Sequence, residues 1–120
     1  SYPDLKVIVS PSSVGIVAAA QAVKDQGKIG KVYVTGLGLP SEMAGAIKSG
    51  ASKSFAIWNP IDLGYAATYL ADDLVKGTAT KTEASMGKLG KVKLDAEGNG
   101  AMAKPFVYDA SNIDKFSKIF

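Results

Sequence analysis

The stretch KVIVSPSSVGIVAAA, residues 6–20, indicates the fold class of this chain. Its first part, Lys6 to Val9, is a β-branched run that is apolar on successive residues, as a buried parallel strand is. A Ser-Pro-Ser-Ser break follows, in which Ser12 or Ser13 can cap a helix by accepting a bond from a free backbone N–H. Apolar residues then recur at helical spacing from Val14 to Gln26, and Gly27 can end that helix. The stretch therefore predicts a strand–loop–helix unit.

The same unit follows twice more along the chain. Strands are predicted at Lys31 to Thr35 and at Ser54 to Trp58. Helices are predicted from Ser41, as the capping residue, through Lys48, and from Asp62 to Lys76. Strands that alternate with helices predict parallel βαβ units with right-handed crossovers. The fold class is therefore α/β, of the Rossmann-like or flavodoxin-like kind.

The composition changes after residue 77. Small and polar residues fill 78–90, which predicts a loop with one weak strand. Short strands are predicted at Lys91 to Leu94 and at Pro105 to Tyr108, and one helical turn at Ser111 to Phe116. Three parallel strands without further partners make a thin core with exposed edges. We therefore expect an incomplete domain that self-associates or swaps strands to cover those edges.

The composition excludes most catalytic chemistry. The 120 residues include no Cys and no His, and all 14 basic residues are Lys. Disulfides, thiol catalysis, the usual zinc sites, histidine bases and bidentate guanidinium clamps are therefore excluded. The net charge of +3 is spread along the chain, which favours a solvated surface over a nucleic-acid patch. No apolar run approaches the ~20 residues that a membrane span needs.

Ligands of open parallel sheets bind at the carboxyl ends of the strands. The residues that follow the three predicted strands supply hydroxyls, backbone amides, one side-chain amide and one indole, which suit a neutral polyol better than catalysis. The candidate ligand-binding residues are Pro11, Ser12, Ser13, Gly38, Trp58 and Asn59.

Each candidate also has a purely structural interpretation. Ser12 and Ser13 can act as helix caps alone, and Trp58 can belong to the core. The Gly36-Leu37-Gly38 sequence is similar to a dinucleotide-binding loop, but Ser41 stands where the third glycine of that motif belongs, so a tight turn is the stronger interpretation.

Five segments carry a resemblance to a known family: Tyr2-Pro3-Asp4-Leu5, Pro11-Ser12-Ser13, Thr35 to Pro40, Phe55 to Pro60 with Asp62 to Tyr65, and Pro105-Phe106-Val107 with Asn112 to Phe116. Together they resemble the C-terminal portion of a type I periplasmic solute-binding protein of a sugar ABC transporter, in the branch of rhamnose-binding proteins and autoinducer-2 receptors. The resemblance covers essentially the whole chain.

The resemblance implies a receptor of two α/β lobes, joined by three hinge strands, that close on a ligand. Residues 1–58 would belong to the ligand-binding C-terminal lobe, 59–90 to a crossover helix and loop of the other lobe, and 91–120 to a tail that returns across the hinge. Pro11 and Ser13 would contact the ligand, and Trp58 and Asn59 would face it. Gly38 would end a strand at the cleft, where ribose-binding members carry an acidic residue.

The implied function is the capture of a rhamnose-like deoxysugar or related small polyol in the inter-lobe cleft, for import through a membrane permease. No cofactor, metal or nucleic acid is implied, and the location would be the periplasm or a lipid-anchored site outside the cytoplasm. Two alternatives stay open. The chain could be the effector-binding domain of a sugar-responsive transcription regulator, or a nucleotide-using α/β enzyme.

Overall fold

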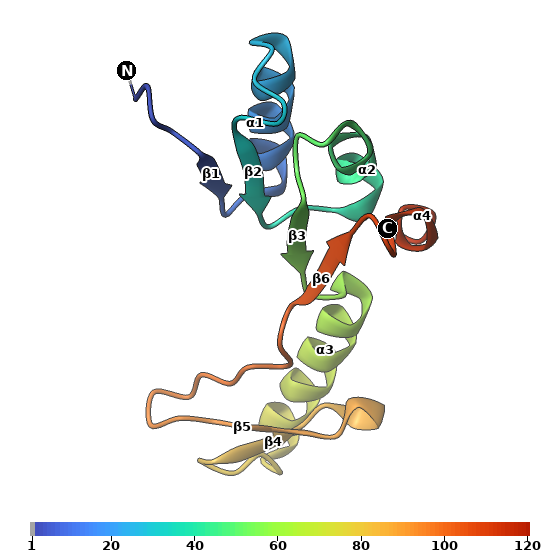
Figure 1. The fold of residues 1–120 in the computed structure, drawn as a ribbon. Coiled ribbons are helices and arrows are strands. Elements are labelled where there is room, and N and C mark those ends of the chain that lie inside the picture. The colour runs from blue at the N-terminus through green and yellow to red at the C-terminus, as the bar shows by residue number, and fades with distance from the viewer. Residues whose placement is uncertain (1) are drawn as a thin grey trace. The chain divides into compact units, whose positions relative to one another are not determined.

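The computed structural model of the chain describes residues 2–120, which form two compact units (Figure 1). Unit 1 comprises the residues up to Ile57 together with Phe106–Phe120, and unit 2 comprises Trp58–Pro105. The chain therefore passes between the units twice. Within the described residues no helix is long and apolar enough to cross a membrane.

Unit 1 contains the first two of the predicted strand–helix units and the strand of the third, whose helix belongs to unit 2. Its elements, in chain order, are β1 (Val7–Ser10), α1 (Ser13–Asp25), β2 (Tyr33–Gly36), α2 (Pro40–Ser49), β3 (Ser54–Ile57), β6 (Phe106–Asp109) and the short α4 (Ile113–Phe116). β1 and β2 are parallel, with Val7 opposite Tyr33. A parallel bridge between Leu37 and Ala56 joins β2 to β3, and β6 pairs antiparallel with β3.

The core of unit 1 lies between these strands and the helices that connect them. Ile16 of α1, Val34 of β2 and Met43 of α2 are completely buried, and the rings of Phe55 and Tyr108 stack with centroids 5.3 Å apart. Burial raises the pKa of the Tyr108 hydroxyl. The prediction of buried strands is confirmed for β2 and β3, which contribute Val34 and Phe55 to this core, but it is wrong for β1, where Val7 and Val9 are 48% and 69% exposed because its outer edge has no neighbouring strand among the described residues.

Unit 2 is smaller and is built on one long helix. Its elements are α3 (Pro60–Lys76), β4 (Glu83–Ser85), a 3₁₀ turn (Gly87–Leu89) and β5 (Lys91–Lys93). β4 and β5 form an antiparallel pair whose buried residues pack on Ala66 of α3. The weak strand predicted within residues 78–90 is β4.

The observed helix ends confirm one of the capping predictions and contradict another. Ser12 is the N-cap of α1, as predicted, and its Oγ accepts a hydrogen bond from the Gly15 N–H. The prediction that Ser41 caps the second helix is wrong, because α2 begins at Pro40 with Leu39 as its N-cap. α3 likewise begins at Pro60 rather than Asp62. In both cases proline, whose fixed φ suits the first helical position, starts the helix earlier.

Candidate functional site

The six candidate residues lie in both units. Pro11, Ser12, Ser13 and Gly38 belong to unit 1, and the other two, Trp58 and Asn59, begin unit 2.

The carboxyl ends of β1 and β2 lie directly against each other. The Ser10 carbonyl oxygen accepts a hydrogen bond from the Leu37 N–H at 2.9 Å. A Cβ at Gly36 would lie 1.8 Å from that same oxygen, and the φ of Gly36 is +136°. A residue without a side chain is therefore required for the strands to end this close together. This contact places the Pro11–Ser13 and Gly38 segments at one edge of the sheet.

The Pro11–Ser13 segment leads into the N-terminus of α1. The Ser12 Oγ accepts from Gly15, and the Ser12 carbonyl accepts from the Ile16 N–H at 2.9 Å and from the Ser10 hydroxyl at 3.2 Å. Ser13 is the first helical residue, and its hydroxyl has no protein partner among residues 2–120. The first turn of α1 contains no acidic residue, so its positive dipole end is not neutralised by its own side chains. A contact between the Ser13 hydroxyl and a ligand stays a prediction.

Gly38 lies beneath the surface of this edge. A Cβ at Gly38 would lie 3.0 Å from Met43 Cγ and 3.1 Å from Ile16 Cγ2, and its N–H donates to the Ala56 carbonyl at 3.3 Å. The absence of a side chain therefore serves the packing of α1 and α2 against β3. A contact between Gly38 and a ligand stays a prediction.

Trp58 and Asn59 stand just before α3, and both side chains are engaged within unit 2. The Trp58 Nε1–H donates to the Ala103 carbonyl at 2.6 Å. The Asn59 Oδ1 caps α3 by accepting from the Ile61 N–H at 2.9 Å, and its Nδ2 donates to the Asp62 carboxylate at 3.0 Å. The indole is half-buried, and its N–H is already engaged in this bond, so a ligand contact of Trp58 stays a prediction.

The side chains of the six candidate residues are all uncharged. None of the six residues is titratable, and the described residues hold no cluster of three or more His, Cys, Asp or Glu side chains that could bind a metal ion. Hydroxyls, backbone amides and one aromatic ring are the groups that bind uncharged polar ligands.

Three residues that contact these segments are not among the ligand-binding residues predicted from the sequence. Ser10, at the end of β1, donates to the Ser12 carbonyl, Gly36 permits the contact of the two strand ends, and Ala103 fixes the Trp58 indole. The position of Ser10 directly before Pro11 was a usable signal. Nothing in the sequence indicated Ala103, because it lies 45 residues from its partner.

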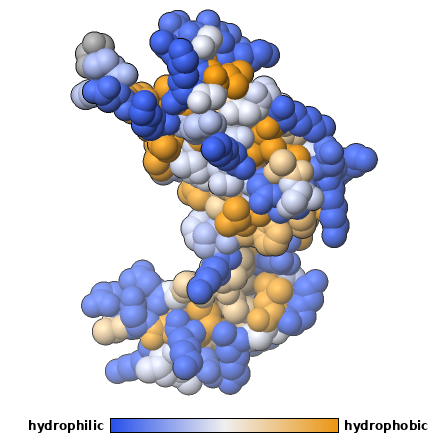
Figure 2. Space-filling view, in the orientation of Figure 1, coloured by the Kyte–Doolittle hydropathy of each residue, from blue (hydrophilic) through white to orange (hydrophobic). Residues whose placement is uncertain are grey.

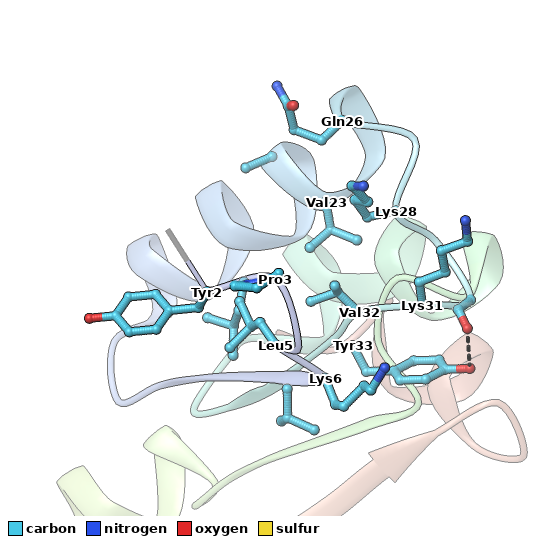
Figure 3. Close-up of a pocket in the computed structure, with 14 residues that line it drawn as sticks. Tyr2, Pro3, Leu5, Lys6, Val23, Gln26, Lys28, Lys31, Val32 and Tyr33 are labelled. Atoms are coloured by element: carbon cyan, nitrogen blue, oxygen red, sulfur yellow. Dashed lines mark hydrogen bonds between the residues drawn. The ribbon is translucent and has the colours of Figure 1, made fainter.

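A hollow lies elsewhere in unit 1, at the amino-terminal end of β1 and β2 (Figure 3). It has a volume of about 790 Å³, and none of the six candidates lines it. The hollow is therefore separate from the candidate site.

Residues 1–79 match the family model described as periplasmic binding protein domain. Two solved structures are similar over almost the whole chain. A sugar ABC transporter protein from Actinomyces odontolyticus ATCC 17982 is 39% identical over 96% of this chain, with a TM-score of 0.75. An ABC transporter solute binding protein from Clostridium phytofermentas, with bound L-rhamnose, is 38% identical over 98% of this chain, with a TM-score of 0.82.

A third structure, LsrB from Clostridium saccharobutylicum in complex with AI-2, has a TM-score of 0.77 at 17% identity and therefore shows the fold alone. This chain spans 38%, 41% and 40% of the three solved chains, in the order given. These likenesses confirm the predicted α/β fold as part of a periplasmic-binding-protein lobe, and the relatives are binding proteins rather than enzymes. Since the family model matches residues 1–79 of 120, the chain belongs to the periplasmic binding protein family.

Proposed function

We propose that this chain is the C-terminal portion of a receptor that binds a sugar outside the cytoplasm and delivers it to the permease of an ABC transporter. The observation that carries the proposal is the 38% identity, over 98% of the chain, to a solute binding protein with bound L-rhamnose. The neutral character of the six candidate residues supports an uncharged ligand of this class.

The proposed ligand is a rhamnose-like deoxysugar or a related small polyol. Such a molecule offers hydroxyl groups to hydrogen-bonding partners and a C–H face to an aromatic ring. In this proposal the Ser13 hydroxyl and the backbone of Pro11 bind sugar hydroxyls, and a ring face of Trp58 packs on the C–H face. Gly38 supplies no carboxylate, which argues against a ribose-type site.

The proposed mechanism breaks no bond. A receptor of the relatives' length closes its lobes on the sugar, since closure removes the sugar from water and completes its hydrogen bonds. The closed form then carries the sugar to the membrane permease. Asn59 serves this step by capping α3 and so fixing the direction in which the chain continues from Trp58.

The proposal is tested with a chimeric receptor in which this chain replaces the matching 41% of the Clostridium phytofermentas protein. We expect L-rhamnose to raise the melting temperature of the chimera, and D-ribose to raise it less or not at all. Absence of stabilisation by every member of a panel of deoxysugars would count decisively against sugar binding by this chain.

Two variants of the chimera test the assigned residues. Ser13→Ala and Trp58→Ala are expected to weaken rhamnose binding in calorimetry by about tenfold each, because each removes one ligand contact of about 1.4 kcal/mol. Ser49→Ala is the matched control, since the Ser49 hydroxyl donates to the Ala46 carbonyl near the end of α2, and it should leave binding unchanged.

A further inference from the structure

Asn99 and Gly100 end an exposed turn that follows β5 in unit 2. All residues from Asp95 to Gly100 are exposed. Figure 2 shows mostly hydrophilic residues at the surface where this loop lies in Figure 1. The turn is closed by hydrogen bonds from the Asp95 N–H to the Asn99 carbonyl at 2.9 Å and from the Gly98 N–H to the Asp95 carbonyl at 3.1 Å. The Asn99 side chain is therefore in contact with water.

The backbone nitrogen of Gly100 is free to attack the Asn99 side chain. The Gly100 N–H donates no hydrogen bond to any of residues 2–120, and glycine has no side chain that would shield the neighbouring amide carbon, Asn99 Cγ. The Asn99 Nδ2 lies 3.4 Å from both carboxylate oxygens of Asp95, so the amide is held only weakly. Because the two reacting atoms are neighbours in the chain, closure of a cyclic imide is favoured by proximity.

Packing explains why glycine stands at position 100. A Cβ there would lie 2.5 Å from Val92 Cγ2, 2.9 Å from Leu94 Cδ2 and 2.9 Å from the Lys93 carbonyl oxygen. A bulkier residue would hinder attack on the Asn99 amide, but it does not fit unless the backbone of β5 moves. The fold of unit 2 therefore requires the glycine that makes this asparagine reactive.

The other two asparagines of the chain are protected. Asn59 precedes Pro60, whose nitrogen carries no proton that could be lost on attack. Asn112 precedes the β-branched Ile113, which is 2% exposed. Both polar atoms of the Asn112 side chain form hydrogen bonds to the backbone at 3.2 Å. Asn99 is thus the asparagine whose surroundings permit the reaction.

We propose that Asn99–Gly100 is a site of spontaneous covalent modification in which water is the co-reactant. Asparagine is among the thermolabile residues of proteins. The Gly100 nitrogen forms a bond to Asn99 Cγ, the Cγ–Nδ2 bond breaks, and Nδ2 leaves as ammonia with the proton that the Gly100 nitrogen loses. Water then opens the cyclic imide at one of its two carbonyl carbons. The product is isoaspartate or aspartate at position 99.

The modification should loosen unit 2. The Asp95 carboxylate accepts hydrogen bonds from the Asn99 N–H at 2.8 Å and from the Glu97 N–H at 3.0 Å. These bonds, the Asn99 bond first, hold the pKa of Asp95 below its usual value. A carboxylate at position 99 would repel that of Asp95, and isoaspartate would also lengthen the main chain beside the closely packed Gly100. This consequence does not depend on the proposed sugar receptor.

The test ages the purified 120-residue chain at physiological temperature, at neutral and at mildly alkaline pH. Fragmentation of the tryptic peptide that begins after Lys93 assigns the replacement of NH₂ by OH to residue 99 or to residue 112. We expect Asn99 to react at least about tenfold faster than Asn112, which corresponds to about 1.4 kcal/mol in activation free energy. The rate should rise with pH, because hydroxide removes the Gly100 proton.

Two variants separate this reaction from other damage. Asn99→Gln keeps an amide but closes a larger ring more slowly, so it should stay unmodified at residue 99. Asn99→Asp carries the charge of the product from the start. The Trp58 fluorescence transition should occur at a lower urea concentration in the aged parent chain and in fresh Asn99→Asp than in the fresh parent chain. Aged Asn99→Gln should match its own fresh sample.

The outcomes decide both parts of the proposal. An unmodified Asn99 in the folded chain would overturn the inference, and modification there only after unfolding in urea would mean that the turn protects the amide. Equal rates at Asn99 and Asn112 would also overturn it. Modification of Asn99 that leaves the Trp58 transition unchanged would confirm the site and overturn the loosening of unit 2.

Discussion

Gly36 is the residue on which the shared edge of β1 and β2 depends most directly. Gly36→Ala would bring a methyl group within 1.8 Å of the Ser10 carbonyl oxygen at a φ of +136°. Because backbone, and not a flexible side chain, must move, we expect a loss of at least about 2 kcal/mol in the free energy of unfolding. Urea denaturation followed by circular dichroism measures it.

Gly45→Ala provides the control for this substitution. Gly45 lies within α2, and a Cβ there meets no atom within 4 Å. Alanine in a helix interior is better than glycine by about 0.5–1 kcal/mol, so this variant should be more stable than the parent chain. Equal effects of the two changes would show that the Ser10 contact does not constrain residue 36.

For single residues, features set by the neighbouring sequence, such as helix caps, can be predicted, whereas contacts between residues distant in the sequence cannot. Ser12 was predicted as a cap because a serine that precedes an apolar helical pattern satisfies a free N–H. Ser41 was predicted on the same grounds and is not a cap, because Pro40 begins the helix. The burial of Gly38 under Met43 and Ile16 depends on the packing of α1 and α2, which no local pattern reports.

At the scale of elements, Asp73 joins α3 to β4. Its carboxylate accepts hydrogen bonds from the Ser85 N–H at 2.6 Å and from the Thr78 hydroxyl at 2.8 Å. These two bonds, the Ser85 bond first, hold the pKa of Asp73 below its usual value of 3.8. The stability gained from the depressed pKa is complete above the unfolded value and is lost as the pH falls through the lower folded value.

Asp73→Asn should therefore make the free energy of unfolding of unit 2 depend less on pH in the acid range. Between about pH 5 and about pH 2 the parent chain should lose more stability than the variant, because the variant has no carboxylate to protonate at this position. The fluorescence of Trp58, the single tryptophan and a member of unit 2, reports the transition. Parallel pH curves for the two proteins would contradict the assigned role.

Asp72→Asn is the neighbouring control. Asp72 pairs with Lys76 at 2.8 Å on the exposed face of the same helix. Exposed ion pairs of this kind contribute about 0–1 kcal/mol, so the urea midpoint at neutral pH should change little.

Most elements could be predicted because apolar periodicity and glycine stops are local properties. Gly50 and Gly77, for example, end α2 and α3 in left-handed conformations, with φ of +81° and +68°. The pairing of β6 with β3 could not be predicted, since Tyr108 lies far along the sequence from its partner Phe55, with unit 2 between them. The division of the chain into lobes of a larger receptor stays a prediction.

For the whole molecule, the isolated chain is expected to self-associate and to bind sugars weakly or not at all. The outer edges of β1 and β6 are unpaired within the described residues, and the relatives that bind ligands are more than twice as long. Because the chain carries a net charge of +3, two copies repel each other and added salt should strengthen their association. Sedimentation at two ionic strengths and calorimetry with L-rhamnose test this, and a monodisperse monomer with micromolar affinity would contradict it.

The two units are also expected to unfold separately, because their cores differ in size. Unit 1 buries Phe55, Tyr108 and eight other core side chains, whereas the buried cluster of unit 2 contains four residues, among them Met86. The Trp58 fluorescence transition should therefore occur at a lower urea concentration than the main circular dichroism transition. Met86→Ala should lower the free energy of unfolding of unit 2 by at least about 2 kcal/mol. It should therefore shift only the fluorescence transition to a lower urea concentration. Val34→Ala should move the circular dichroism transition instead, and coincident transitions in all three proteins would mean that the units unfold as one.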